Sequence, residues 1–160
     1  MMKSETVKID PAKDGVDHIN IRYDAVTELG RLLDNLSHTP FRHPEHGKFE
    51  SVEGFYWWLV SGKKLEILRK IHGPEVRKYA KALSGDVAHQ TGLYNHLVPT
   101  VVLSKIIQNQ SLHDKFTESE LPFKCYSVYG KSKLKIIEGR GHHNQVEFLE
   151  RLRDALKVTV

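Results

Sequence analysis

The sequence lacks the features that anchor a protein in a membrane or fix its fold covalently. It has one cysteine, Cys125, among 160 residues, so no disulfide can form within the chain, and a reducing compartment is the simplest expectation. No stretch approaches the roughly 20 apolar residues of a membrane span, and residues 1–15 contain no apolar segment typical of a signal peptide. We therefore expect a cytoplasmic protein with no membrane partner. Cys125 is either a small buried residue in an apolar strand, which we favour, or a reactive thiol.

Motifs that bind metals and nucleotide phosphates are also missing. Among ten histidines, His38, His43 and His46 fall in one predicted loop, but no H-E-x-x-H and no cysteine cluster accompanies them. The chain contains neither G-x-x-x-x-G-K-[ST] nor G-x-S-x-G. The sequence therefore argues against a metal site, a Walker-type phosphate loop and an α/β-hydrolase nucleophile, and no cofactor is expected.

The charge is mildly positive and dispersed. Lysine and arginine total 24 against 20 aspartate and glutamate, a formal charge of +4. The densest basic groups are Lys131–Lys135, which reads KSKLK, and Lys63–Lys64. Such dispersion is more typical of a solubilising surface than of a face that binds duplex nucleic acid. Anionic ligands are compatible with either interpretation.

The hydrophobic pattern is that of one domain after a polar lead-in. A chain of 160 residues fits a single domain and buries roughly 68–70% of the surface that its unfolded form exposes. Residues 1–17 are mostly polar and are expected to be loosely held. Residues 18–160 carry the domain, which begins with a strand predicted from the alternation of Ile19, Ile21 and Tyr23.

Helix signals fill much of the remaining chain. Ser51 is expected to cap one helix, Pro74 to begin another and Pro99 to open a third. Residues 24–37 suit a short helix interrupted by Gly30, and residues 38–49 suit a loop or an edge strand. The expected helices are 51–60, 64–71, 74–83, 100–110 and 145–158, and the expected later strands are 122–129 and 134–137. This order predicts an α+β fold, predominantly helical, with a small β-sheet.

Glu53 is the first candidate for chemistry. It lies near the start of a helix that also contains Phe55, Tyr56, Trp57 and Trp58. If Glu53 lines a cleft, partial desolvation raises the pKa of its carboxyl and makes it a usable acid or base. The neighbouring aromatic rings would then stack on a flat ligand ring. The alternative is a surface carboxylate that stabilises the positive end of the helix.

Asn35 and the segment before the last helix offer polar contacts. Asn35 presents a donor and an acceptor, which suit a sugar hydroxyl or a base edge, and an asparagine that bonds its own backbone in a turn is the alternative. Gly139 and Gly141 can present backbone N–H groups to a phosphate at a helix start, and Arg140 can add a bidentate contact. For this segment the alternative is a plain strand-to-helix turn.

Three stretches, HINI, TELGRLLDNLSHTPF and GKFESVEGFYWWL, combine a strand, a turn and a helix start in a recognisable order. They resemble the I-N-x-Y-S strand, the L-S-N-F turn and the T/S-x-E helix start of the NADAR family, which is named for its association with NAD and ADP-ribose. PEVRKYAKAL and FLERLRDAL resemble two later helices of the same family. The resemblance covers about residues 18–157 and is strongest over 18–60.

The resemblance implies an N-glycosidic ligand. Family members act on ribosylamine-type compounds or remove ADP-ribose from guanine in nucleic acid, and some are antitoxins against DarT-type DNA ADP-ribosyltransferases. Phage members similar to this chain are linked to blocking that defence. The implied partners are an ADP-ribose-type ligand or ADP-ribosylated guanine in DNA, together with a DarT-type transferase. If a phage encodes the chain, they meet in the host cytoplasm.

The resemblance also implies roles for individual residues. By motif position, Asn35 would hold the ligand and Glu53 would act as general base or bind the ribose. Tyr23 falls on the strand motif and is expected to contact the ligand, and the rings of Phe55 and Trp57 would stack on a base. The phosphates would be held by Gly139, Arg140 and Gly141.

Departures from the family pattern leave catalysis open. Family enzymes often carry a lysine seven residues after the glutamate, where this chain has Val60; the nearest lysines are Lys63 and Lys64. A lysine there can form a Schiff base with an opened ribose. The family's W-G-D-G has only a weak match at residues 137–140. The expectations are therefore a hydrolase of ADP-ribosylated guanine, a catalytically inactive binder that inhibits the transferase, or an N-glycosidase for a small ribosylamine.

Overall fold

Helices account for most of the regular structure, and strands occur in short pairs. The computed structural model describes residues 8–84, 91–130, 132–138 and 142–158. In that part of the chain the elements are η1 (Pro11–Lys13), β1 (Ile19–Asn20), α1 (Glu28–Leu33), β2 (Phe41–His43), β3 (Gly47–Phe49), α2 (Val52–Val60), η2 (Glu66–Arg69), α3 (Pro74–Ser84), α4 (Thr91–Gln108), α5 (Gln110–Glu118), β4 (Phe123–Lys124), β5 (Tyr126–Tyr129), β6 (Lys135–Glu138) and α6 (His142–Val158). The expected α+β class with predominant helix is confirmed.

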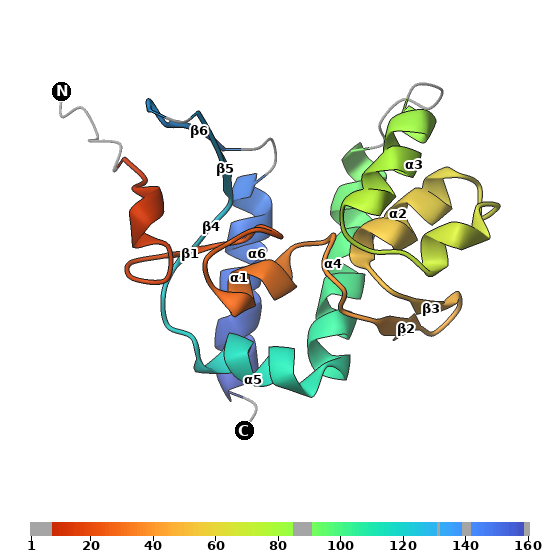
Figure 1. Ribbon diagram of the computed structural model, residues 1–160. Helices are drawn as coiled ribbons and strands as arrows, with labels where there is room; N and C mark the ends of the chain where they lie inside the picture. Colours follow the sequence, from red (N-terminus) through yellow and green to blue (C-terminus); the bar gives the residue numbers. More distant parts are fainter. Residues whose placement is uncertain (1–7, 85–90, 131, 139–141, 159–160) are drawn as a thin grey trace.

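Two groups of elements lie on either side of the molecule (Figure 1). α2, α3 and the β2–β3 hairpin pack on one side of α4. On the other side lie α1, α6, the β1–β4 pair and the β5–β6 hairpin, and α5 connects the two groups. β1 and β4 pair in parallel, whereas the other two pairs are antiparallel. No helix in the described ranges is long and apolar enough to cross a membrane.

Two helix starts depend on side-chain caps. Thr27 and Ser51 accept hydrogen bonds from the backbone N–H groups of Gly30 and Gly54, each at 3.0 Å, and so satisfy an amide that has no partner within the first turn. A Cβ at Gly30 would lie 2.1 Å from Asn20 O, so α1 can approach β1 only because this residue has no side chain. Gly30 therefore serves packing and does not interrupt the helix.

Several predicted boundaries are confirmed. Ser51 caps α2, and α3 begins at Pro74. The last helix ends at Val158 as expected, and the β5–β6 hairpin turns across Gly130, whose φ is +96°.

Other elements differ from expectation because long-range contacts decide them. Residues 38–49 were expected to form a loop or an edge strand, but residues 41–49 form the β2–β3 hairpin. The helix expected at 64–71 is only the short 3-10 helix η2, because Arg69 O accepts from Glu50 N at 3.0 Å instead of continuing a helical ladder. Pro99 lies inside α4 and does not open it, and α5 was not predicted. In the part of the chain that the structure describes, the strands form three separate two-stranded sheets.

Candidate functional site

A cavity of about 350 Å³ lies between the two groups of elements, within the size range of small-molecule sites. The residues that line it come from segments far apart in the sequence, from Ile21 to Gln145. Asn35 and Glu53, predicted independently from separate segments, both line it. The other lining residues are Ile21, Arg22, Asp34, Leu36, Arg77, Cys125, Tyr126, Ser127, Ile137 and Gln145.

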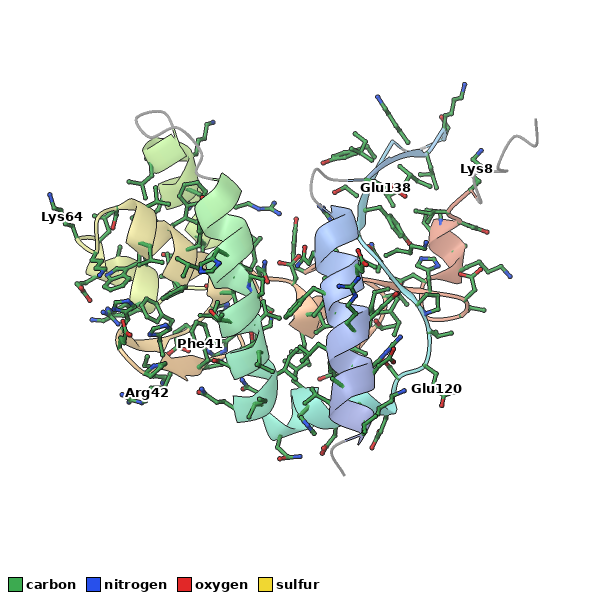
Figure 2. All side chains as sticks on the ribbon, turned by 180° about the vertical axis from the view of Figure 1, so that it is seen from behind. Lys8, Phe41, Arg42, Lys64, Glu120 and Glu138 are labelled. Atoms are coloured by element: carbon green, nitrogen blue, oxygen red, sulfur yellow. The ribbon has the colours of Figure 1, made fainter. Side chains whose placement is uncertain are left out.

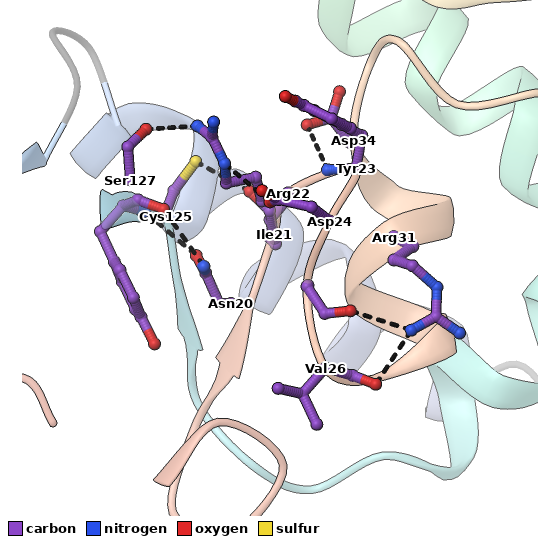
Figure 3. A network of polar contacts seen from close by, with 12 residues as sticks. Asn20, Ile21, Arg22, Tyr23, Asp24, Val26, Arg31, Asp34, Cys125 and Ser127 are labelled. Carbon is purple, nitrogen blue, oxygen red and sulfur yellow. Dashed lines mark hydrogen bonds and ion pairs between the residues drawn. The ribbon is translucent and has the colours of Figure 1, made fainter. Parts of the chain in front are cut away.

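The turn that carries Asn35 is fixed by the carboxylate before it. Asp34 ends α1, and its two oxygens accept from Tyr23 N at 3.0 Å and from Leu36 N at 2.7 Å. Figure 3 shows the Asp34–Tyr23 bond joining this turn to the strand segment beside it. Both carboxylate oxygens thus serve the backbone, and Asn35 is held buried at the cavity wall.

Lys105 holds the same turn through hydrogen bonds to its backbone. It is fully buried on α4, and its ammonium donates to Leu32 O at 2.8 Å and to Asp34 O at 3.0 Å. A cation at this place also suits the negative end of α1. Burial lowers the pKa of Lys105 to about 7, and the charge of Asp34 acts against that shift. Sequence reasoning missed this residue because a lysine in an apolar helix stripe usually extends its charged end to solvent.

Glu53 lies in the first turn of α2 and is tied to Asn35 through the main chain. Its backbone N–H donates to Asn35 O at 2.8 Å. Its Oε2 accepts from Trp57 Nε1 at 2.9 Å, one helical turn away. Trp57 therefore helps to orient the carboxylate. The two predicted residues are joined by a backbone hydrogen bond, and both line the cavity.

Phe55 is a correction to the predicted site. Only 2% of its surface is exposed, and it packs edge-on against Phe49 with ring centroids 5.0 Å apart. Its position on α2 directs the ring toward the hydrophobic core, so Phe55 cannot stack on a ligand. Tyr23 and Trp57 are half-buried and contact lining residues, but neither is among the described residues that line the cavity. Gly139, Arg140 and Gly141 lie outside the described residues.

Two guanidinium groups line the cavity together with the carboxylates of Asp34 and Glu53. Arg22 and Arg77 both line it, and their Cζ atoms lie 5.1 Å and 4.9 Å from the centroid of the Tyr23 ring. Arg22 is held further by Asp24, at 2.7 Å, and by the hydroxyl of Ser127 (Figure 3). Arginine forks of this kind suit phosphate and carboxylate. Arg77 gave no signal in the sequence, because an arginine on a polar helix face is usually solvated.

Cys125 is a half-buried thiol that lies between β4 and β5 and lines the cavity. Its Sγ donates to Ile21 O at 3.3 Å. Burial raises its pKa to about 12; Asp34 adds to this shift and Arg22 opposes it. A thiol with such a pKa holds its proton at neutral pH, which argues against the alternative of a reactive thiol. The favoured interpretation, a buried residue within a strand, is wrong on both points, because Cys125 is half-buried and lies between two strands.

His43 and His46, two of the three histidines expected in a loop, lie in the β2–β3 hairpin and pack as aromatic rings. His43 and His46 stack with centroids 4.7 Å apart, and His43 also stacks on Phe55. Burial, followed by the neighbouring charge of His46, lowers the pKa of His43. Across the described ranges, no three His, Cys, Asp or Glu side chains are grouped as metal ligands.

Lys63 and Lys64 lie beyond the end of α2, whereas Glu53 lies at its start. Both lysines are exposed, and Figure 2 shows Lys64 at the outer edge of the α2 group. No lysine is among the described residues that line the cavity. At the family's lysine position, Val60 is half-buried.

Comparison with known proteins returned no matching family model, no matching curated protein and no matching solved structure.

Proposed function

We propose that the cavity binds ADP-ribose joined through an N-glycosidic bond to guanine in DNA, and that the protein counteracts DNA ADP-ribosylation by a DarT-type toxin. The observation that carries this proposal is that Asn35 and Glu53 converge on one cavity of about 350 Å³ together with Arg22 and Arg77. Carboxylate, amide and guanidinium groups match the hydroxyls and phosphates of such a ligand. The resemblance to the NADAR family supports the same assignment, and the cytoplasm is the proposed place of action.

The reaction that we propose is a hydrolysis. Water adds to the anomeric carbon of the ribose while the bond from that carbon to the guanine nitrogen breaks. Glu53 takes a proton from the water, the electron pair of the broken bond leaves with the guanine nitrogen, and Glu53 then returns this proton to that nitrogen. Asn35 holds the sugar, and Arg22 and Arg77 hold the phosphates. A positioned base of this kind supplies on the order of 10²–10⁴ in rate.

A second candidate is a binder that inhibits the transferase without turnover. The observation that favours it is the lack of a lysine among the described lining residues, which removes those residues as a source of a Schiff base with ribose. An N-glycosidase for a free ribosylamine is a weaker third candidate, because two arginines at one cavity suit a ligand with more negative charge than a simple ribosylamine carries.

The test is to incubate the protein with an oligonucleotide that carries ADP-ribose on guanine and to follow release by mass spectrometry. Release that is lost in Glu53→Gln supports the hydrolase. No release, with inhibition of the transferase at a one-to-one ratio, supports the binder. No release, no inhibition and no binding of ADP-ribose would contradict the proposal.

A further inference from the structure

The β5–β6 hairpin exposes large apolar side chains beside the cavity. Tyr129 is 53% exposed, Leu134 56% and Ile137 44%. Exposed apolar groups that gather on one element of a soluble domain commonly mark a binding surface. Lys133 and Lys135 are exposed on the same hairpin, within the KSKLK stretch whose charge was first interpreted as solubilising.

The strand register shows which of these residues continue the cavity. Ser127 pairs with Ile137, and both line the cavity. Side chains two residues apart along a strand project from the same face. Tyr129 and its partner Lys135 are two residues beyond Ser127 and Ile137, so they extend the cavity-lining face outward along the hairpin. Val128, one residue out of phase, belongs to the opposite face; there Tyr126 lines the cavity but its strand partner Glu138 is not among the described lining residues.

We infer that Tyr129 and Lys135 form an outer subsite for the nucleotide next to the one bound in the cavity. This inference rests on the proposed function and deepens it. An exposed phenol ring stacks on bases of any sequence, and an adjacent ammonium neutralises the backbone phosphate. Directly opposed residues in an antiparallel pair keep the two groups side by side. The preferred ligand is therefore ADP-ribose carried on a single-stranded nucleic-acid segment, not the free compound.

The test compares two ligands in matched variants. Fluorescence anisotropy gives the Kd of a five-nucleotide, labelled single-stranded DNA with ADP-ribose on its central guanine, measured in the Glu53→Gln background to prevent turnover. Calorimetry gives the Kd of free ADP-ribose. Tyr129→Ala and Lys135→Ala are compared with Val128→Ala, on the opposite hairpin face, and with Lys124→Ala, an exposed lysine on β4.

We expect Tyr129→Ala to weaken oligonucleotide binding about 5- to 150-fold, the loss typical of one stacked base. Lys135→Ala should reduce the slope of log affinity against log salt by about 0.7, as for one phosphate contact to a single strand. Neither variant should change the Kd of free ADP-ribose, and neither control should change either Kd.

Equal oligonucleotide affinity in Tyr129→Ala, Lys135→Ala and the two controls would overturn the subsite. An equal loss for free ADP-ribose would also overturn it, because the two side chains would then contact the ADP-ribose itself. Failure of the proposed function has a different signature, namely that free ADP-ribose binds to no variant, including the wild type. Failure of the subsite alone leaves that binding intact.

Discussion

At the scale of single residues, the proposed hydrolysis depends on the charge of Glu53. Glutamine at this position retains an oxygen that can accept from Trp57 Nε1, so Glu53→Gln should fold with an unchanged Tm. It cannot take a proton from water, and we expect release of ADP-ribose to slow by about 10²–10⁴-fold. Release is measured by mass spectrometry under single-turnover conditions. Release at the wild-type rate would remove Glu53 from the mechanism.

Lys105 should give the protein a distinctive dependence of stability on pH. Its pKa is about 7 in the folded protein against 10.5 for an unperturbed lysine. Between these values the unfolded chain binds a proton that the folded protein does not, so this residue makes the free energy of unfolding rise with pH. The rise is at most about 1.4 kcal/mol per pH unit for one proton.

Lys105→Met removes this titration. We therefore expect the free energy of unfolding of the wild type, minus that of the variant, to be flat below pH about 6 and to grow from about pH 7 to 9.5. Urea denaturation at a series of pH values measures both. A difference that does not change across this range would mean that the buried amine does not titrate there.

At the scale of single elements, the start of α2 fixes the orientation of Glu53. The hydroxyl of Ser51 accepts from Gly54 N and donates to Ile71 O at 3.1 Å. Ser51→Ala should therefore cost about 1–2 kcal/mol, since the cap is lost and a buried acceptor loses its donor. We expect Tm to fall by several degrees. Ser104→Ala is the control, because the hydroxyl of Ser104 donates to Thr100 O within α4 and caps no helix start, so the Tm of this variant should stay nearly unchanged.

Elements defined by local chemistry were predictable from the sequence, and those defined by distant contacts were not. The cap at Ser51 and the start of α3 at Pro74 follow from side chains within one turn. The turn at Gly130 is equally local. By contrast, η2 is shortened by a bond from Glu50, and Gly30 is explained only by Asn20 O, ten residues earlier. Neither contact produces a hydrophobic periodicity that could be recognised in the sequence.

The candidate site divides in the same way. Asn35 and Glu53 were predicted because they fall on short motifs. Lys105 and Arg77 come from helices far along the chain and have meaning only once α4 and α3 are packed. Phe55 was assigned wrongly because aromatic content alone does not tell which face of α2 is buried, whereas the structure directs it against Phe49.

At the scale of the whole molecule, the cavity exists because separate segments meet around it. Arg77 lines it from α3, and Arg22 lines it from the segment after β1. Arg77→Met should weaken binding of ADP-ribose by about 10- to 150-fold, the loss typical of a hydrogen bond to a charged group. Lys78→Met, at the next position on α3 and exposed, changes net charge equally and should leave the Kd unchanged. An equal loss of affinity for ADP-ribose in the two variants would mean that only the net charge of the protein matters, and would contradict direct contact by Arg77.

The most direct measurement is a calorimetric titration of ADP-ribose into the wild type and into Asn35→Ala. Asn35 O is a backbone atom, so its bond to Glu53 N can persist in the variant, and the substitution removes only the amide side chain. We predict binding to the wild type with one ligand per chain, and clearly weaker binding to Asn35→Ala. No binding to the wild type at millimolar ADP-ribose, or equal affinity in the two proteins, would contradict a ligand site built on Asn35 and Glu53.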